Sequence, residues 1–366
     1  MDTNNIFFAG KTALSIIRHI RRRSDLRLAP TSIREVTALP GSYVRLSRLG
    51  IPQLCSLLDA REGNELHILV PTRESRRRSH GIRCEVRSVP RGEHPYMQLT
   101  SADKRYPSPL LPSNGRIFVE SIPSVVVTLA AELCAHERAG RISHQQAVLK
   151  LLKLCQELCG TYVHDPFHPL AGEVVYERSP VLTFEELECF VNGLKHVRGV
   201  RLVREVLPHV FERSGSPQES FLGPAMFCEP ALGGHELGTY KANVSLDLSP
   251  AQRRVITCKQ ITPDFQMEQY LTAMEYNGKV HEDGIMPEKD RVRMLDYQTL
   301  GWHAFVFTNR DVRTPSAFNS SIRRILAIIE QYEGPSAVRA FEKRVADPEF
   351  LARQKVLFEV YRPWLS

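Results

Sequence analysis

Two apolar-alternating segments, each carrying one acid, constrain the fold of this 366-residue chain most. The segments read ITPDFQM and LTAMEYN, and the midpoint between Asp264 and Glu275 falls just before Tyr270. If the chain turns there, the two acids lie directly opposite each other on one face of an antiparallel strand pair. Facing carboxylates repel unless they are solvated, protonated or bridged by a cation, and Mg2+ prefers hard oxygen ligands of this kind. The pair therefore indicates a metal site.

A structural role is the alternative for each acid. Asp264 follows Pro263 and could be a polar residue at a strand edge. Glu275 could form an ion pair with Arg291 or Arg293 in the segment EKDRVRMLDYQTL. Both alternatives remain open at the level of sequence, because surface and structural ion pairs are common.

The predicted site also includes three polar residues that follow Glu275 in the sequence. Asn277 shares the face of Glu275 by the period of two and could position a water or a phosphate. Lys279 is a candidate phosphate contact, and His281 is a candidate proton donor. Solvated surface side chains are the alternative interpretation of Lys279 and His281.

A third carboxylate comes from a predicted helix start. In SPQE, Ser216 is the expected N-cap, Pro217 takes the first helical position, and Glu219 follows three residues after the cap. Glu219 could close a capping box, or bind metal if the first turn of its helix packs beside the strands. The two roles are compatible.

The pattern along the chain predicts a mixed α/β (α+β) fold in several regions. The first is a basic, β-rich part with a short first helix at 11–23 and strands within 43–47, 65–70, 81–89 and 116–121. A strand is also expected in RRVITCKQ, and Pro315 is expected to open a long helix. The expected regions are 1–121, a helical middle region 122–213, an α/β region 214–332 and a helical tail 333–366.

Positive charge is concentrated in the first third. Residues 1–120 contain 20 Lys and Arg against 11 Asp and Glu, which leaves 28 against 30 for the rest of the 48 and 41 in the chain. Such clusters attract a phosphate backbone, although a solvated cationic face is equally consistent with them. The clustered arginines are Arg21, Arg22, Arg23, Arg76, Arg77 and Arg78.

Composition predicts a cytoplasmic protein that does not enter a membrane. No run approaches the roughly 18 apolar residues of a membrane span, and MDTNNIFFAG lacks the basic start of a secretory signal. The eight cysteines include no Cys-x-x-Cys, which argues against a zinc ribbon and favours free thiols in a reducing compartment.

The region from about 214 to 330 resembles the PD-(D/E)XK nuclease superfamily. More narrowly, it is similar to the very-short-patch-repair-like endonuclease domain found in AbiEi-type antitoxin relatives. The similarity lies in a helix, strands, helix, strand, helix order and in a spaced set of motif residues. They are Ser216-Pro217-Gln218-Glu219, Asp264, Glu275-Tyr276-Asn277-Gly278, His281, Asp290, Arg293, Leu300-Gly301 and Asp311-Val312.

The resemblance implies a restriction-endonuclease-like domain that hydrolyses DNA phosphodiester bonds with Mg2+, or with Mn2+. It implies metal binding by Glu219, Asp264 and Glu275, with Asn277, Lys279 and His281 assisting catalysis.

One departure from the family supports a second hypothesis. Asn277 stands where the superfamily has Lys and the narrower family usually has Asp, although Lys279 or Lys259 could substitute for the missing charge. The alternative is a catalytically inactive nuclease-fold protein that binds DNA or a protein partner, as an antitoxin-like regulator in a toxin-antitoxin or defence system.

Overall fold

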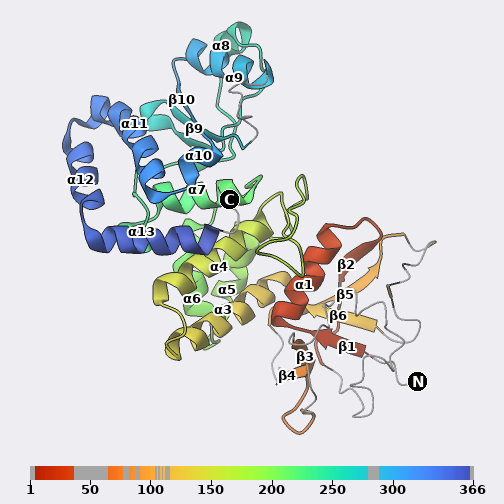
Figure 1. The fold of residues 1–366 in the computed structure, drawn as a ribbon. Helices are drawn as coiled ribbons and strands as arrows, with labels where there is room; N and C mark the ends of the chain where they lie inside the picture. Colours follow the sequence, from red (N-terminus) through yellow and green to blue (C-terminus); the bar gives the residue numbers. More distant parts are fainter. Residues whose placement is uncertain are drawn as a thin grey trace. The chain divides into compact units, whose positions relative to one another are not determined.

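The chain forms two compact units (Figure 1), which consist of Met1–Ile142 with Tyr162–Pro208, and of Ser143–Thr161 with His209–Ser366. The predicted helical middle region 122–213 is therefore divided between the two units and does not stand alone. The structure, a computed structural model, describes residues 5–36, 65–76, 82–86, 91–103, 105, 108, 110–111, 116–278 and 288–362. The strand expected at 43–47 lies outside these residues.

A six-stranded mixed sheet organises the first unit. Its strand order is β2-β5-β6-β1-β3-β4, in which β6 with β1 and β3 with β4 run parallel and the other neighbours antiparallel. The strands are β1 (Asn5–Phe8), β2 (Leu26–Pro30), β3 (Leu66–Val70), β4 (Ile82–Val86), β5 (Tyr96–Ser101) and β6 (Arg116–Glu120). The expectation of strands within 65–70, 81–89 and 116–121 is confirmed.

Helices cover this sheet. Helix α1 (Gly10–Arg21) packs against β3, β6 and α3 (Ile122–Arg138) through Ala13, Ile16 and Ile17, all of which are buried. The predicted first helix is therefore confirmed. Helices α5 (Phe184–Asn192) and α6 (Val200–Val206) pack against α3. Gly199 permits this packing, because its φ is +91° and a Cβ there would lie 2.5 Å from the carbonyl oxygen of Val127.

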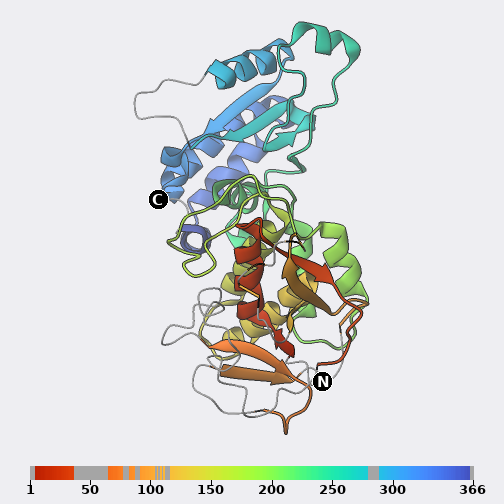
Figure 2. The same cartoon turned by 90° about the vertical axis from the view of Figure 1, so that its right-hand side faces the viewer.

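A four-stranded sheet forms the centre of the second unit (Figure 2), with the order β10-β9-β8-β7. Strands β7 (Lys241–Ala242), β8 (Phe265–Met267) and β9 (Thr272–Tyr276) are antiparallel, and β10 (His303–Phe307) runs parallel to β9. Helix α9 (Glu288–Thr299) lies between β9 and β10 in the chain, as a parallel connection requires.

Two helices of the second unit, α7 (Pro217–Phe227) and α11 (Pro315–Glu333), begin where they were predicted. Helix α7 precedes the sheet, and α11 begins at the expected proline. The others are α4 (His144–Cys159), η3 (Pro230–Leu232), α8 (Pro250–Val255), α10 (Asn309–Val312), α12 (Ser336–Val345) and α13 (Pro348–Tyr361), with η2 (Leu207–His209) at the boundary of the units. Among the described residues, no helix is long and apolar enough to cross a membrane.

The strand expected in RRVITCKQ is wrong. Its first three residues end α8, and the rest is irregular. Asp296 on α9 fixes this segment by accepting the N–H groups of Thr257 at 2.9 Å and Cys258 at 2.7 Å. A side chain distant in sequence therefore satisfies the backbone groups that a neighbouring strand would have paired.

The predicted hairpin is confirmed in its register. Phe265 pairs with Met274, and Met267 pairs with Thr272, so Asp264 and Glu275 are the next opposed positions. The turn is the short 3-10 helix η4 (Glu268–Tyr270) followed by Leu271, whose φ of +46° is left-handed. The sequence pattern alone therefore located the turn.

Candidate functional site

Glu219 is held at the start of α7. Ser216 caps the helix by accepting the Glu219 N–H at 3.1 Å, and its hydroxyl donates to the Glu219 carboxylate at 2.9 Å. The other carboxylate oxygen accepts the N–H of Gly215 at 2.5 Å, one residue before the N-cap. The side chain therefore bends back over the helix start, which orients a carboxyl group that is only 9% exposed.

Asp264 directly precedes β8 and is partly buried. One of its carboxylate oxygens accepts the backbone N–H of Tyr276 at 2.6 Å, across the hairpin. Its own backbone carbonyl accepts the N–H of Asn243 at 3.0 Å. These bonds fix Asp264 beside the end of β9, where Glu275 lies.

Glu275 on β9 is 6% exposed and is bound from helix α9. Arg293 donates to one carboxylate oxygen at 2.9 Å, and the buried hydroxyl of Tyr297 donates to the other at 2.6 Å. The structural alternative for Glu275, an ion pair with Arg293, is thus present in the structure. Arg291 pairs instead with Glu288 on the exposed side of α9.

The three carboxyl groups influence one another. Burial raises the pKa of Glu219 to about 7, and the nearby carboxylate of Glu275 adds to this rise. Burial also raises the pKa of Asp264 well above its usual range, with further contributions from Glu219 and Glu275. For Glu275, burial raises the pKa although Arg293 and Tyr297 partly offset it. Asp264 therefore feels the charge of both other carboxyl groups, and Glu219 feels that of Glu275.

The three acids do not converge fully on one point. Two other groups of possible metal ligands in the described part of the chain have all their ligand atoms within 4.8 Å of one another, and the set Glu219, Asp264 and Glu275 is not one of them. A cation shared by all three would therefore require side-chain movement, most directly by Glu275 away from Arg293.

Asn277 faces helix α9. Its side-chain amide donates to Asp290 at 2.6 Å, so this N–H group is bound within the chain. The expectation that Asn277 positions a water or a phosphate stays a prediction. Lys279 and His281 lie outside the described residues. Lys259 is exposed on the segment after α8.

The first arginine cluster does not form a uniform cationic surface. Arg21 is buried at the end of α1. Arg22 pairs with Glu173 at 3.2 Å, and Arg23 pairs with Asp25 at 2.7 Å. Arg76 is exposed, whereas Arg77 and Arg78 lie outside the described residues.

Tyr297 is a site residue that the sequence analysis missed. It lies four residues after Arg293 on α9, so the helical period places both on one face. That spacing could have identified it as the second group that binds Glu275.

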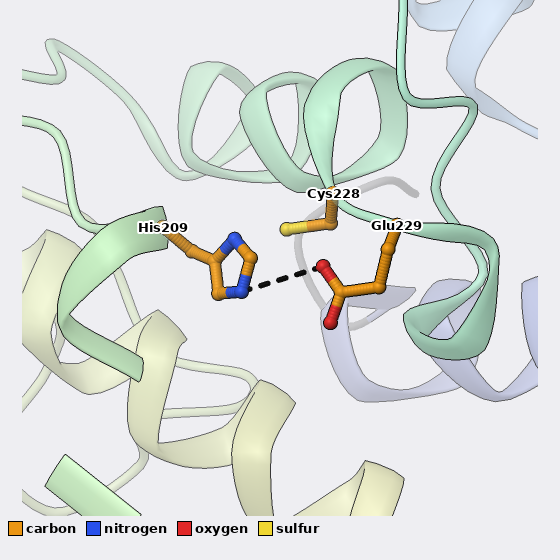
Figure 3. A group of neighbouring side chains, drawn as sticks. All are labelled: His209, Cys228 and Glu229. Atoms are coloured by element: carbon orange, nitrogen blue, oxygen red, sulfur yellow. Dashed lines mark ion pairs between the residues drawn. The ribbon is translucent and has the colours of Figure 1, made fainter. Parts of the chain in front are cut away.

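Two further clusters were not predicted. In the first unit, His67 lies 3.3 Å from both Glu85 and Glu132, and Arg83 is close to the same two acids. In the second unit, the side chains of His209, Cys228 and Glu229 face one another (Figure 3). Apart from the adjacent Cys228 and Glu229, the members of each cluster are too far apart in sequence for spacing to reveal them.

Comparison with known proteins gives no match to a protein-family model, to a curated protein or to a solved structure. The functional argument therefore rests on the geometry of the chain itself.

Proposed function

We propose that the second unit is a Mg2+-dependent endonuclease domain that hydrolyses DNA phosphodiester bonds. The observation that carries this proposal is the excess of carboxyl groups at the hairpin. Burial raises the pKa of all three acids, Glu275 adds to the rise for Glu219, and both of them add to the rise for Asp264. Among the described residues, Arg293 is the cationic side chain that pairs with this group. Three buried or partly buried acids beside one cation favour either proton uptake or a divalent ion.

The residues present suit a hard cation. All three offer carboxylate oxygens, which Mg2+ and Mn2+ accept readily. A bound ion of this kind supplies charge stabilisation at a scissile phosphate and activates a water. Glu219 would bind the ion from helix α7, and Asp264 would bind it from the position directly before β8. Glu275 would become a third ligand once it releases Arg293.

The order of elements adds support. Helix α7, the antiparallel strands β7 to β9, helix α9 and the parallel strand β10 occur in the helix, strands, helix, strand order that the resemblance leads us to expect, with the short helix α8 between β7 and β8. The acids lie at the first turn of α7 and on the β8–β9 hairpin, in agreement with the resemblance to very-short-patch-repair-like nucleases. The basic first third of the chain would add sequence-independent attraction to DNA.

The experiment is a nicking and cleavage assay on supercoiled plasmid with Mg2+ or Mn2+. Asp264→Asn and Glu275→Gln remove one charge each, and Glu330→Gln, an exposed acid on α11, serves as the matched control. The proposal requires activity in the wild type and the control and its loss in both site variants. Equal activity in all four proteins contradicts the site.

A second candidate is a catalytically inactive nuclease-fold protein that binds DNA or a protein partner as an antitoxin-like regulator. Two contacts favour it: Arg293 and Tyr297 occupy both oxygens of Glu275, and Asn277 is bound to Asp290. DNA binding without cleavage, together with no rise in melting temperature on adding Mg2+ or Mn2+, would select this function.

A further inference from the structure

We propose that His209, Cys228 and Glu229 bind a Zn2+-class transition-metal ion, at a site separate from the carboxyl cluster. One ligand atom from each side chain lies within 4.8 Å of the other two. Figure 3 shows the imidazole of His209 facing both the sulfur of Cys228 and the carboxylate of Glu229. The inference does not depend on the proposed nuclease activity.

The spacing of the ligand atoms agrees with a tetrahedral ion. The His209 Nε2 and a Glu229 carboxylate oxygen are 3.4 Å apart. With Zn–N and Zn–O bonds of about 2.0–2.1 Å, tetrahedral geometry places two such ligand atoms about 3.3 Å apart. A direct charge-assisted hydrogen bond between them would be shorter, at about 2.7–2.9 Å. The observed distance is therefore compatible with two ligands of one ion.

The backbone orders two of the three ligands. Cys228 is the C-cap of α7, and its N–H donates to the carbonyl oxygen of Pro224 at 3.2 Å. Glu229 begins the next turn of the chain. Its carbonyl oxygen accepts the N–H groups of Leu232 at 2.9 Å and Gly234 at 3.3 Å. Both ligands thus lie on a fixed turn.

Gly234 makes that turn possible. A Cβ at this position would lie 2.2 Å from the carbonyl oxygen of Cys228, so a larger residue would push the turn apart. His209 approaches from η2, where it is the last residue. The three ligands therefore come from two segments that are 19 residues apart, and an ion would join them.

The donor set selects the metal. A thiolate and an imidazole favour Zn2+ over Mg2+, whereas oxygen-only sites favour Mg2+. Three protein ligands leave a fourth position for water or another ligand, as in zinc sites that are not purely structural. Among the described residues, Glu229 has no lysine or arginine partner, so its charge is available to a cation.

The experiment uses the full chain, stripped with a chelator and titrated with Co2+. A thiolate ligand gives a near-ultraviolet charge-transfer band, and Zn2+ should abolish it by displacing Co2+ at one ion per chain. Mg2+ in excess should leave the band unchanged. Absence of the band from the wild type, or a band that Mg2+ removes, would overturn the proposal.

Variants assign the band to these side chains. Cys228→Ser should remove it, and His209→Gln and Glu229→Gln should each lower the Co2+ affinity at least about tenfold. Cys189→Ser, which changes an exposed free thiol, is the matched control and should keep the wild-type titration. Because Cys228 is 2% exposed and its variant could unfold, the two more exposed ligands keep the test decisive. Unchanged affinity in both His209→Gln and Glu229→Gln would refute the site.

Discussion

Arg293 on α9 binds the carboxylate of Glu275 on β9 across 2.9 Å, directly beside two further acids, Glu219 and Asp264. The side chain of Arg293 is 41% exposed, while that of Glu275 is nearly inaccessible. The arginine therefore approaches the carboxyl cluster from the solvent side. A divalent ion at the proposed site and Arg293 would compete for the same carboxylate, so breaking the ion pair should favour metal binding.

Replacement of Arg293 by glutamine tests this competition. Without metal, Arg293→Gln should lower the free energy of unfolding by about 1–2 kcal/mol, a value reduced for the partial exposure of the pair. Added Mg2+ should then raise the melting temperature more in the variant than in the wild type, because Glu275 is released. Differential scanning fluorimetry across a Mg2+ series measures both effects.

Arg291→Gln is the matched control, since Arg291 forms only an exposed pair with Glu288 on the same helix. Its melting temperature and its Mg2+ response should equal those of the wild type. If Arg293→Gln and Arg291→Gln respond identically to Mg2+, competition at Glu275 is excluded.

Glu219 should make the metal-free protein less stable as the pH rises. Its pKa is about 7 in the folded protein and 4.5 as the ordinary value, so the folded state binds the extra proton between these values. The associated stability is present below pH 4.5 and is lost as the pH rises through 7, by at most about 3 kcal/mol. Urea unfolding at pH 5 and pH 7.5 in the presence of a chelator measures the slope.

Glu219→Gln should reduce this slope, because the amide does not titrate, while the raised pKa values of Asp264 and Glu275 leave the remainder. Glu330→Gln should retain the whole slope. Restoration of stability by Mg2+ at pH 7.5 in the wild type, but not in Glu219→Gln, would link the proton and the metal to one carboxylate. An unchanged slope in Glu219→Gln would mean that the carboxyl group is not responsible.

The hairpin was predictable because its signal is local. Alternation of apolar residues around one turn fixes the register, since a slip by one residue would turn every apolar side chain to the opposite face. The helix start at Ser216 and Pro217 was predictable for the same reason, as capping depends on neighbours within four residues. The position of two of the three acids therefore followed from sequence.

Long-range partners were not predictable in the same way. Nothing near Asp296 in the sequence indicates that its carboxylate caps the N–H groups of Thr257 and Cys258, so RRVITCKQ was taken for a strand. The strands β1 and β2 were also missed, and their partners β6 and β5 lie far along the chain. Strand β5 was missed as well, although it pairs with the next strand, β6. The sequence left two candidate partners for Glu275, because Arg291 and Arg293 both lie on the helix that follows it. Only the structure shows which of the two arginines points toward Glu275.

Asn277→Asp should make the stability of the second unit depend on divalent cations. The new carboxylate would face Asp290, which now accepts a hydrogen bond from Asn277 at 2.6 Å. Loss of that bond and repulsion between the two acids should lower the free energy of unfolding by about 1–2 kcal/mol in metal-free buffer. Mg2+ should recover part of this loss, which thermal melting with and without chelator measures.

The double variant Asn277→Asp with Asp290→Asn serves as the control, because it restores one acid and one amide in exchanged positions. Its stability should return toward that of the wild type. If Asn277→Asp alone is as stable as the wild type in metal-free buffer, the Asn277–Asp290 contact contributes nothing.

His235 should make the second unit less stable as the pH falls, which is opposite to the effect of Glu219. The ring is 1% exposed and contacts Asn319 at 2.8 Å and Gln354 at 3.1 Å. Burial lowers the pKa of His235 from 6.5 to about 4; the hydrogen bond to Asn319 offsets part of this lowering, and the charge of Arg344 adds a smaller one. Between these values only the unfolded chain binds the proton, so stability is lost as the pH falls from 6.5 to 4, by about 3 kcal/mol.

Replacement of His235 separates this effect from that of Glu219, whose contribution has the other sign. His235→Gln should abolish the loss between pH 6.5 and 4 even though it lowers stability at pH 7, and the partly exposed His303→Gln should preserve it. Urea unfolding followed by tryptophan fluorescence reports on the second unit through Trp302, which belongs to it. A wild-type acid dependence in His235→Gln would show that another group titrates there.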